Sequence, residues 1–84
     1  MQNDVSVQTN NTATQVTLGK ITLYFSYKTL IAFRTPGGLN VSENYWGTTT
    51  GKTLNAIEPN KDNRLCWEEF DARLTTMMVE HGLV

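Results

Sequence analysis

The sequence predicts a small α+β protein, in which a three-stranded antiparallel β-meander packs against a C-terminal α-helix, with a short helical segment between them. Three observations predict it: an alternating apolar pattern that begins at Ile21, a Pro-Gly-Gly turn at residues 36–38, and an apolar stripe with helical spacing over residues 67–81. With 84 residues the chain can build one small core, so we expect a single domain over residues 16–84.

Residues 1–15 differ from the rest in composition. They consist mainly of Asn, Gln, Thr and Ser, and contain only two valines. Because such a segment offers little apolar surface to bury, we expect a disordered or loosely attached N-terminal tail.

The first strands are predicted from the apolar pattern. Ile21, Leu23 and Phe25 alternate with polar or amphipathic residues, which is typical of a half-buried strand. Residues 30–33 are all apolar, which indicates a central strand covered on both faces. Residues 26–28 contain neither Gly nor Pro, so a turn there and one long bent strand remain alternatives.

The next turn is better specified. In the run Thr35-Pro36-Gly37-Gly38, the proline fixes φ at the second position and Gly37 supplies the positive φ that a type II turn requires. We expect a third strand after it, with Leu39 and Val41 toward the core.

Two helices are predicted after the sheet. The spacing of Leu54 and Ile57 favours a short helix within residues 48–57, capped by Thr48 or Thr49. A charged turn follows over residues 58–64. The clearest helix covers residues 65–81, with Asn63 as its cap and Gly82 at its end. Its apolar stripe consists of Trp67, Phe70, Leu74, Met77, Met78 and His81.

Charge and composition exclude several classes of protein. The net charge of -1 and the pI of about 5.7 argue against a protein held to duplex nucleic acid by a strongly basic surface. The single cysteine, Cys66, and the absence of a long apolar run or leader favour a cytoplasmic protein that does not enter the membrane. Cys66 and His81 lie about 22 Å apart on one helix, so they cannot form a catalytic dyad. We expect no enzyme activity.

Residues 47–53, GTTTGKT, are similar to a phosphate-binding loop. That motif needs four residues between its glycines, and here there are three, so we do not expect a nucleotide hydrolase. A weaker alternative is a small-anion binder at the segment Thr48 to Lys52, which would use Lys52 and the N–H groups at the start of the short helix.

Residues 58–69 imitate a calcium-binding EF loop. The oxygen-bearing side chains of Glu58, Asn60, Asp62 and Glu69 fall at ligand positions one, three, five and twelve. Glu replaces the usual Asp at the first position and Asn63 replaces the turn glycine, so helix capping explains the pattern better. We expect no metal and no cofactor.

A nucleic-acid interpretation rests on aromatic and basic residues in the same region. The rings are Tyr24, Tyr27, Tyr45 and Trp46, and the cations are Lys20, Lys28, Arg34 and Lys52. Because the net charge is negative, we favour rings that complete a core or a protein interface.

Residues 23–74 resemble a family of short uncharacterised domains common in bacteriophage and metagenomic sequences. The resemblance is carried by AFRTP at residues 32–36, VSEN at 41–44, TTTGK at 48–52 and the EEF helix start at 68–70. It implies phage origin and a location in the host cytoplasm, but no activity and no catalytic residues.

We therefore expect a non-catalytic interaction module that binds a host or phage protein; the nucleic-acid accessory protein and the anion binder are the alternatives. The candidate dimer surfaces are a sheet edge and the end of the helix at Met77 and Met78. The expected binding residues are Glu43, Asn44, Tyr45, Trp46, Thr48, Thr49, Thr50 and Lys52, together with Arg34.

Overall fold

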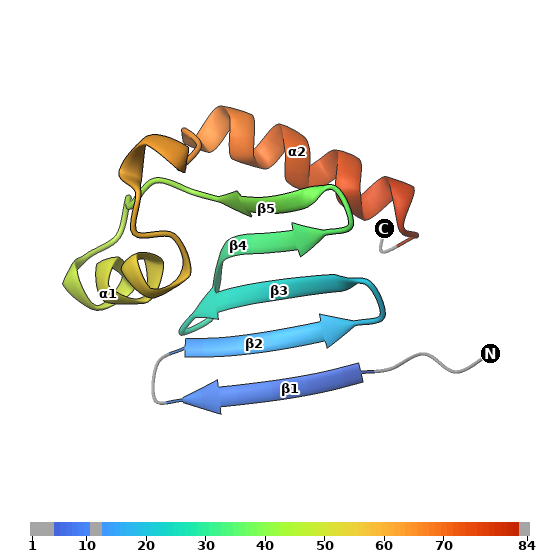
Figure 1. Cartoon of the computed structure of the whole chain (residues 1–84), viewed down its shortest axis with the longest axis horizontal. Coiled ribbons are helices and arrows are strands. Elements are labelled where there is room, and N and C mark those ends of the chain that lie inside the picture. The colour runs from blue at the N-terminus through green and yellow to red at the C-terminus, as the bar shows by residue number, and fades with distance from the viewer. Residues whose placement is uncertain (1–4, 11–12, 83–84) are drawn as a thin grey trace.

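The computed structural model describes residues 5–10 and 13–82 and confirms an α+β fold (Figure 1). Five strands form one antiparallel sheet in the order β1-β2-β3-β4-β5. Two α-helices and one short 3-10 helix follow the sheet in the chain. The elements are β1 (Val5–Asn10), β2 (Ala13–Leu18), β3 (Ile21–Ser26), β4 (Thr29–Thr35), β5 (Gly38–Val41), α1 (Thr48–Ile57), η1 (Lys61–Asn63) and α2 (Trp67–Glu80).

The prediction of a three-stranded meander is wrong in its strand count, because β1 and β2 extend the sheet. All of β1 and the first half of β2 come from residues that the composition assigned to a tail. Their pairing is regular, with Val5 opposite Leu18 and Val7 opposite Val16. Backbone hydrogen bonds between two strands need no large apolar side chains, so a composition rich in Thr, Gln and Ser concealed them.

The β3–β4 connection is a tight turn, so the alternative of one long bent strand is excluded. Tyr27 occupies the turn with a φ of 55°, a value that non-glycine residues seldom adopt. The register between the two strands shifts between Tyr24 and Phe25, which leaves Ile31 without a partner opposite it.

The β4–β5 turn lies where it was predicted but differs in conformation. Its positive φ, 136°, falls on Gly38 instead of Gly37. The N–H of Gly37 donates to Oγ1 of Thr35 at 3.1 Å, so the threonine side chain holds the turn.

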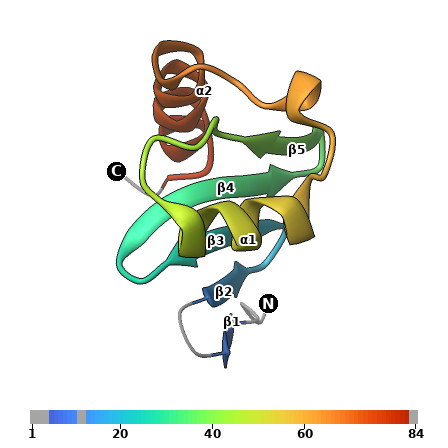
Figure 2. The same ribbon diagram turned by 90° about the vertical axis from the view of Figure 1, so that its left-hand side faces the viewer.

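The core lies on both faces of β4, as the apolar run predicts. Ile31, Ala32 and Phe33 are all buried. One cluster joins the sheet to α2 and consists of Ile21, Phe33, Phe70 and Met77. The other joins the sheet to α1 and consists of Ile31, Ala32, Val41 and Leu54. Figure 2 separates the two helices, with α2 to one side of the stacked strands and α1 in front of them.

Helix α2 confirms most of the predicted apolar stripe. Phe70 and Met77 are buried, and Leu74 and Met78 pack against them. The prediction that Trp67 and His81 belong to the buried stripe is wrong. Both side chains are exposed, one at each end of the helix, where the sheet no longer covers them. Gly82, with a φ of 68°, follows the helix as predicted.

The predicted caps are wrong. Cys66 is the N-cap of α2 and Gly47 that of α1, and neither makes a side-chain capping bond. Asn63 lies in η1 instead. The hydrogen bond to the first N–H group of α2 comes instead from Tyr45, which lies in the connection between β5 and α1.

The two edges of the sheet differ. At β5, the N–H of Leu65 donates to the carbonyl of Val41 at 2.7 Å, and the N–H of Glu43 donates to the carbonyl of Leu65 at 2.8 Å. These bonds cover the Val41 end of that edge, and Arg73 of α2 contacts Asn40 farther along the strand. Strand β1 forms the other edge, which lies farthest from α2 in Figure 1. Neither described helix has the length and apolar character needed to cross a bilayer.

Candidate functional site

Residues 43–47 connect β5 to α1 and contain much of the predicted binding segment. Asn44 folds this connection on itself: its Oδ1 accepts from the N–H of Trp46 at 2.9 Å, and its Nδ2 donates to the carbonyl of Gly47 at 3.0 Å. Gly51 of α1 packs closely here, since a Cβ on it would lie 3.0 Å from Nδ2 of Asn44. Asn44 therefore has a structural role.

Tyr45 links this connection to the start of α2. Its hydroxyl accepts a hydrogen bond from the N–H of Trp67 at 2.9 Å and donates to Oε1 of Glu43 at 3.0 Å. The N–H groups in the first turn of a helix have no partner within it, so Tyr45 supplies the capping acceptor that Cys66 does not.

The same neighbours set the acidity of Tyr45. The hydrogen bond from the Trp67 N–H lowers the pKa of this phenol, whereas desolvation and the adjacent Glu43 carboxylate raise it. The net result is a pKa above the ordinary value of 10.0. Tyr45 is thus a neutral hydrogen-bonding group at physiological pH.

Three large aromatic side chains are exposed around this junction: 53% of Tyr45, 40% of Trp46 and 44% of Trp67. We call them the aromatic surface. The rings of Tyr45 and Trp46 meet edge to face, with centroids 5.9 Å apart and an interplanar angle of 86°. The ring of Trp67 lies 5.8 Å from that of the buried Phe70, so it is anchored to the core.

The threonines of α1 divide into two groups. Thr50 is buried, and its hydroxyl lies 2.7 Å from that of Ser26 on β3, so it joins the helix to the sheet. Thr48, Thr49 and Lys52 are exposed. Of the predicted anion-binding residues, only these three are available to a ligand.

A hollow of about 410 Å³ lies beside the connection. It is lined by Glu43, Asn44, Tyr45, Gly51, Asn55, Lys61 and Arg64. Arg64 donates to the carbonyl of Glu58 at 2.9 Å and to Oδ1 of Asn55 at 2.7 Å, which holds the 58–64 turn against α1. Sequence reasoning missed Arg64 and Lys61, whose only signal is their position in a charged turn.

The structure does not bring Arg34 into this hollow. Arg34 lines a different one, of about 590 Å³, together with Thr53 and Ile57 of α1 and Gln8 and Gln15 of the outer strands. The residues of the nucleic-acid interpretation are also dispersed. Lys20 and Lys28 lie in the turns at opposite ends of β3, about 20 Å apart for six residues.

In the loop that resembles an EF hand, side-chain oxygens accept hydrogen bonds from other residues of the same loop. The carboxylate of Glu58 accepts from the N–H of Asn60 at 3.3 Å and from Nδ2 of Asn63 at 3.4 Å. Asn60 in turn accepts from the N–H of Asp62 at 3.0 Å. Among the residues that the structure describes, no group of three His, Cys, Asp or Glu side chains could hold a metal ion.

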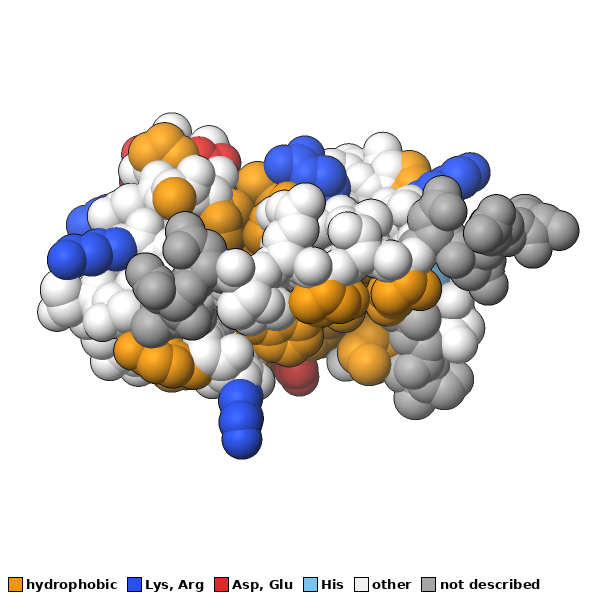
Figure 3. Space-filling model, turned by 90° about the horizontal axis from the view of Figure 1, so that it is seen from below, with side chains coloured by type: hydrophobic (Ala, Val, Ile, Leu, Met, Phe, Trp, Pro, Cys, Tyr) orange, Lys and Arg blue, Asp and Glu red, His pale blue; other side chains and the backbone are white. Residues whose placement is uncertain are grey.

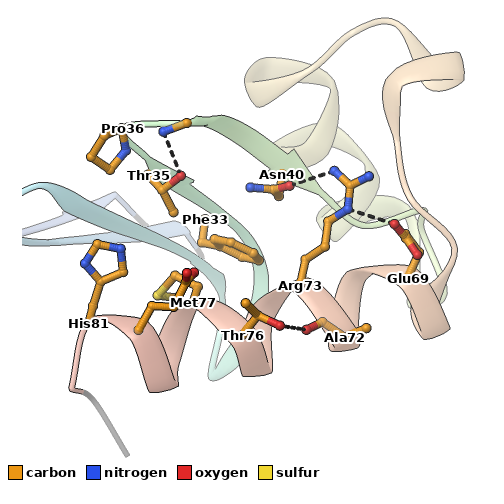
Figure 4. Close-up of a pocket in the computed structure, with 12 residues that line it drawn as sticks. Phe33, Thr35, Pro36, Asn40, Glu69, Ala72, Arg73, Thr76, Met77 and His81 are labelled. Atoms are coloured by element: carbon orange, nitrogen blue, oxygen red, sulfur yellow. Dashed lines mark hydrogen bonds and ion pairs between the residues drawn. The ribbon is translucent and has the colours of Figure 1, made fainter.

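A third hollow, also of about 590 Å³, lies between the β4–β5 turn and α2 (Figure 4). Arg73 crosses it, with Nε 2.9 Å from Oε1 of Glu69 and Nη1 3.2 Å from Oδ1 of Asn40. Glu69 and Arg73 are an i, i+4 pair on α2, a spacing that places opposite charges side by side on a helix. These polar side chains satisfy one another and tie α2 to β5.

Comparison with known proteins places the chain in a family. A family model described as a family of unknown function, DUF8033, matches residues 1–72. The chain belongs to DUF8033. The match confirms the resemblance to an uncharacterised family, and it covers all five strands, α1, the aromatic surface and the first part of α2. No curated protein and no solved structure matches the chain.

Proposed function

We propose that this DUF8033 protein is a small non-catalytic interaction module that binds another protein through the aromatic surface of Tyr45, Trp46 and Trp67. The proposal includes the expectation that this partner is a host or phage protein. The observation that carries it is the exposure of these three rings beside one junction of the chain. Trp and Tyr are the side chains that most often dominate the free energy of protein–protein binding.

The rigidity of the surface supports this function. The hydroxyl of Tyr45 is held by two hydrogen bonds, and Asn44 fixes the backbone at Trp46. Rings that are already in place lose little conformational entropy when a partner binds. A loop with freely rotating rings would bind more weakly for the same contact area.

The surroundings suit a protein partner better than the two alternatives. The hollow beside the rings carries Glu43 as well as Lys61 and Arg64, so its charges are mixed. A polyanion prefers a continuous basic face, and Lys20 and Lys28 are far apart. A rim with both signs of charge around exposed rings is typical of protein interfaces.

The test is a capture experiment with the tagged chain, using nuclease-treated lysate from the cells in which the protein is made. We expect the wild-type chain and Val79→Ala to retain the same protein, and Trp46→Ala to lose it. Val79 is a matched control because it is also exposed, at 64%, and lies on α2 away from the junction.

Two results would overturn the proposal. Retention of the captured protein by Trp46→Ala would exclude the aromatic surface as its binding site. Capture from untreated lysate that disappears after nuclease treatment would instead favour the nucleic-acid alternative. Circular dichroism of each variant separates loss of binding from loss of fold.

A further inference from the structure

The free edge of the sheet has an unusual composition. Strand β1 is an outermost strand of six residues, and an edge strand leaves alternate N–H and C=O groups without partners in the sheet. Most proteins protect such an edge with Lys, Pro or an inward-facing charge. Residues 5–18, which form both outer strands, contain no charged residue and no proline.

One face of the outer strands is apolar. The register places Val5 opposite Leu18 and Val7 opposite Val16, and Val16 lies opposite Leu23 on β3. Residues directly opposite each other in a sheet share a face. Leu23 packs against the cluster under α2, so the apolar face of the core continues to the open edge.

This apolar row is covered near α2 and exposed at β1, where Val5 and Val7 are 65% and 61% exposed. Figure 3 views the molecule from the β1 side: a group of hydrophobic side chains lies in the lower part of this face near its centre, and the Lys and Arg side chains lie toward its margins. The opposite sheet edge is covered in part, by Leu65 at the Val41 end of β5 and by the Arg73 side chain at Asn40, so β1 is the more open edge of the described sheet.

We propose that β1 pairs antiparallel with β1 of a second copy of this chain, which joins the two sheets across a two-fold axis perpendicular to them. The same face of each copy then lies on the same side of the joined sheet. The two apolar rows therefore become continuous, and no like charges meet within the paired strands. This assembly is independent of the aromatic surface.

The symmetry fixes the register. An axis perpendicular to the sheet must place one residue opposite itself, and pairings centred on Val7 or on Gln8 each overlap five residues of β1. We choose the pairing centred on Val7, because it places two apolar side chains opposite each other. Val7 then lies opposite Val7 of the second copy, and Val5 lies opposite Thr9. A single edge of this length buries little area, so we expect a dissociation constant in the range of about 1 µM to 1 mM.

The test measures the mass of the intact chain by sedimentation velocity across that concentration range. The wild-type chain is expected to shift from monomer to dimer as concentration rises. Val7→Lys places two ammonium groups opposite each other and should weaken dimerisation by about tenfold or more. Val79→Lys adds the same charge at an equally exposed site on α2 and should leave dimerisation unchanged.

A charge exchange tests the symmetry directly. Val7→Glu alone should also be monomeric, whereas an equimolar mixture of Val7→Lys and Val7→Glu should form a heterodimer because the opposed charges attract. Recovery in the mixture requires that residue 7 of one copy faces residue 7 of the other.

The proposal is overturned if the wild-type chain remains monomeric at the highest concentration, which would leave the edge open to a strand of a different protein. It is also overturned if Val7→Lys dimerises as well as wild type, or if the Lys–Glu mixture does not associate. Both variants alter an exposed side chain, and circular dichroism checks that they fold.

Discussion

The hydroxyl oxygen of Tyr45 lies 2.9 Å from the backbone nitrogen of Trp67, although the two residues are 22 positions apart in the chain. One side chain on the β5–α1 connection thereby completes the first turn of α2. The same ring is exposed and belongs to the surface proposed for binding. Structural and binding roles therefore coincide at Tyr45, and variants must be chosen to separate them.

Removal of the Tyr45 hydroxyl should destabilise α2. Tyr45→Phe keeps the ring but leaves the Trp67 N–H without its acceptor, so we expect the melting temperature to fall by a few degrees. Thermal unfolding followed by circular dichroism measures this change. Glu43→Gln is the control, since its amide oxygen can still accept from the hydroxyl and the cap remains; an unchanged melting temperature for Tyr45→Phe would contradict the capping role.

Stability should decline in alkaline solution because the folded state raises the pKa of Tyr45. The neutral phenol is favoured in the folded chain, so this contribution is complete below the unfolded pKa of 10.0 and is lost as the pH rises through the folded pKa. A spectrophotometric titration of wild type minus Tyr45→Phe isolates this group. Glu43→Gln should lower the pKa of Tyr45, whereas Glu80→Gln, at the far end of α2, should leave it unchanged. If wild type and both Gln variants give the same titration curve, the Glu43 carboxylate does not raise the pKa of Tyr45.

The hydroxyl pair between Ser26 and Thr50 should show energetic coupling. Ser26→Ala or Thr50→Val alone leaves the other buried hydroxyl without its partner, at a cost of about 1–3 kcal/mol in the free energy of unfolding. The double variant should cost less than the sum of the single changes. Urea unfolding of the four proteins gives the coupling energy, and additive costs would show that the bond does not join α1 to the sheet.

Tyr27 should be replaceable with a gain in stability. A φ of 55° is unfavourable for tyrosine and accessible to glycine, and the side chain is 61% exposed. We expect Tyr27→Gly to raise the free energy of unfolding by about 1 kcal/mol. Lys28→Gly, at the adjacent position without a positive φ, should lower it; if both changes destabilise the chain, the turn has a different conformation in solution.

Leu54 should be the residue on which the attachment of α1 depends. It is completely buried against Ile31, Ala32 and Val41, so Leu54→Ala is expected to cost about 2–5 kcal/mol in chemical unfolding. Val79→Ala, an exposed helical position, should change stability little. A small loss at Leu54 would mean that α1 contributes little to the folded state.

The parts of the fold that could be predicted are those with a dense local apolar pattern. The central strand is recognisable from the consecutive residues Ile31, Ala32 and Phe33, and α2 from the spacing of Phe70 and Met77. These signals lie within one element, and burial of large side chains produces them directly.

Outer strands β1 and β2 could not be recognised in the same way. Strand β1 has only two large apolar residues, Val5 and Val7, and polar residues surround them in the sequence. Its place in the sheet depends on pairing with β2, which in turn pairs with β3. At the candidate site the sequence singled out residues 43–52 but did not indicate which contacts their side chains make. That Tyr45 caps α2 and that Arg64 holds the 58–64 turn follow from contacts between segments distant in sequence, which a local pattern does not contain.

Strand β4 takes part in both cores: Ile31 and Ala32 belong to the cluster under α1, and Phe33 to the cluster under α2. We therefore expect the two helices to unfold together, because disruption of β4 removes the packing partner of both α1 and α2. Amide hydrogens of β4 should exchange with solvent only through global unfolding, whereas those of β1 should exchange first, by local opening of the uncovered edge. Within one small sheet we therefore expect slow exchange at the central strand β4 and rapid exchange at the edge strand β1.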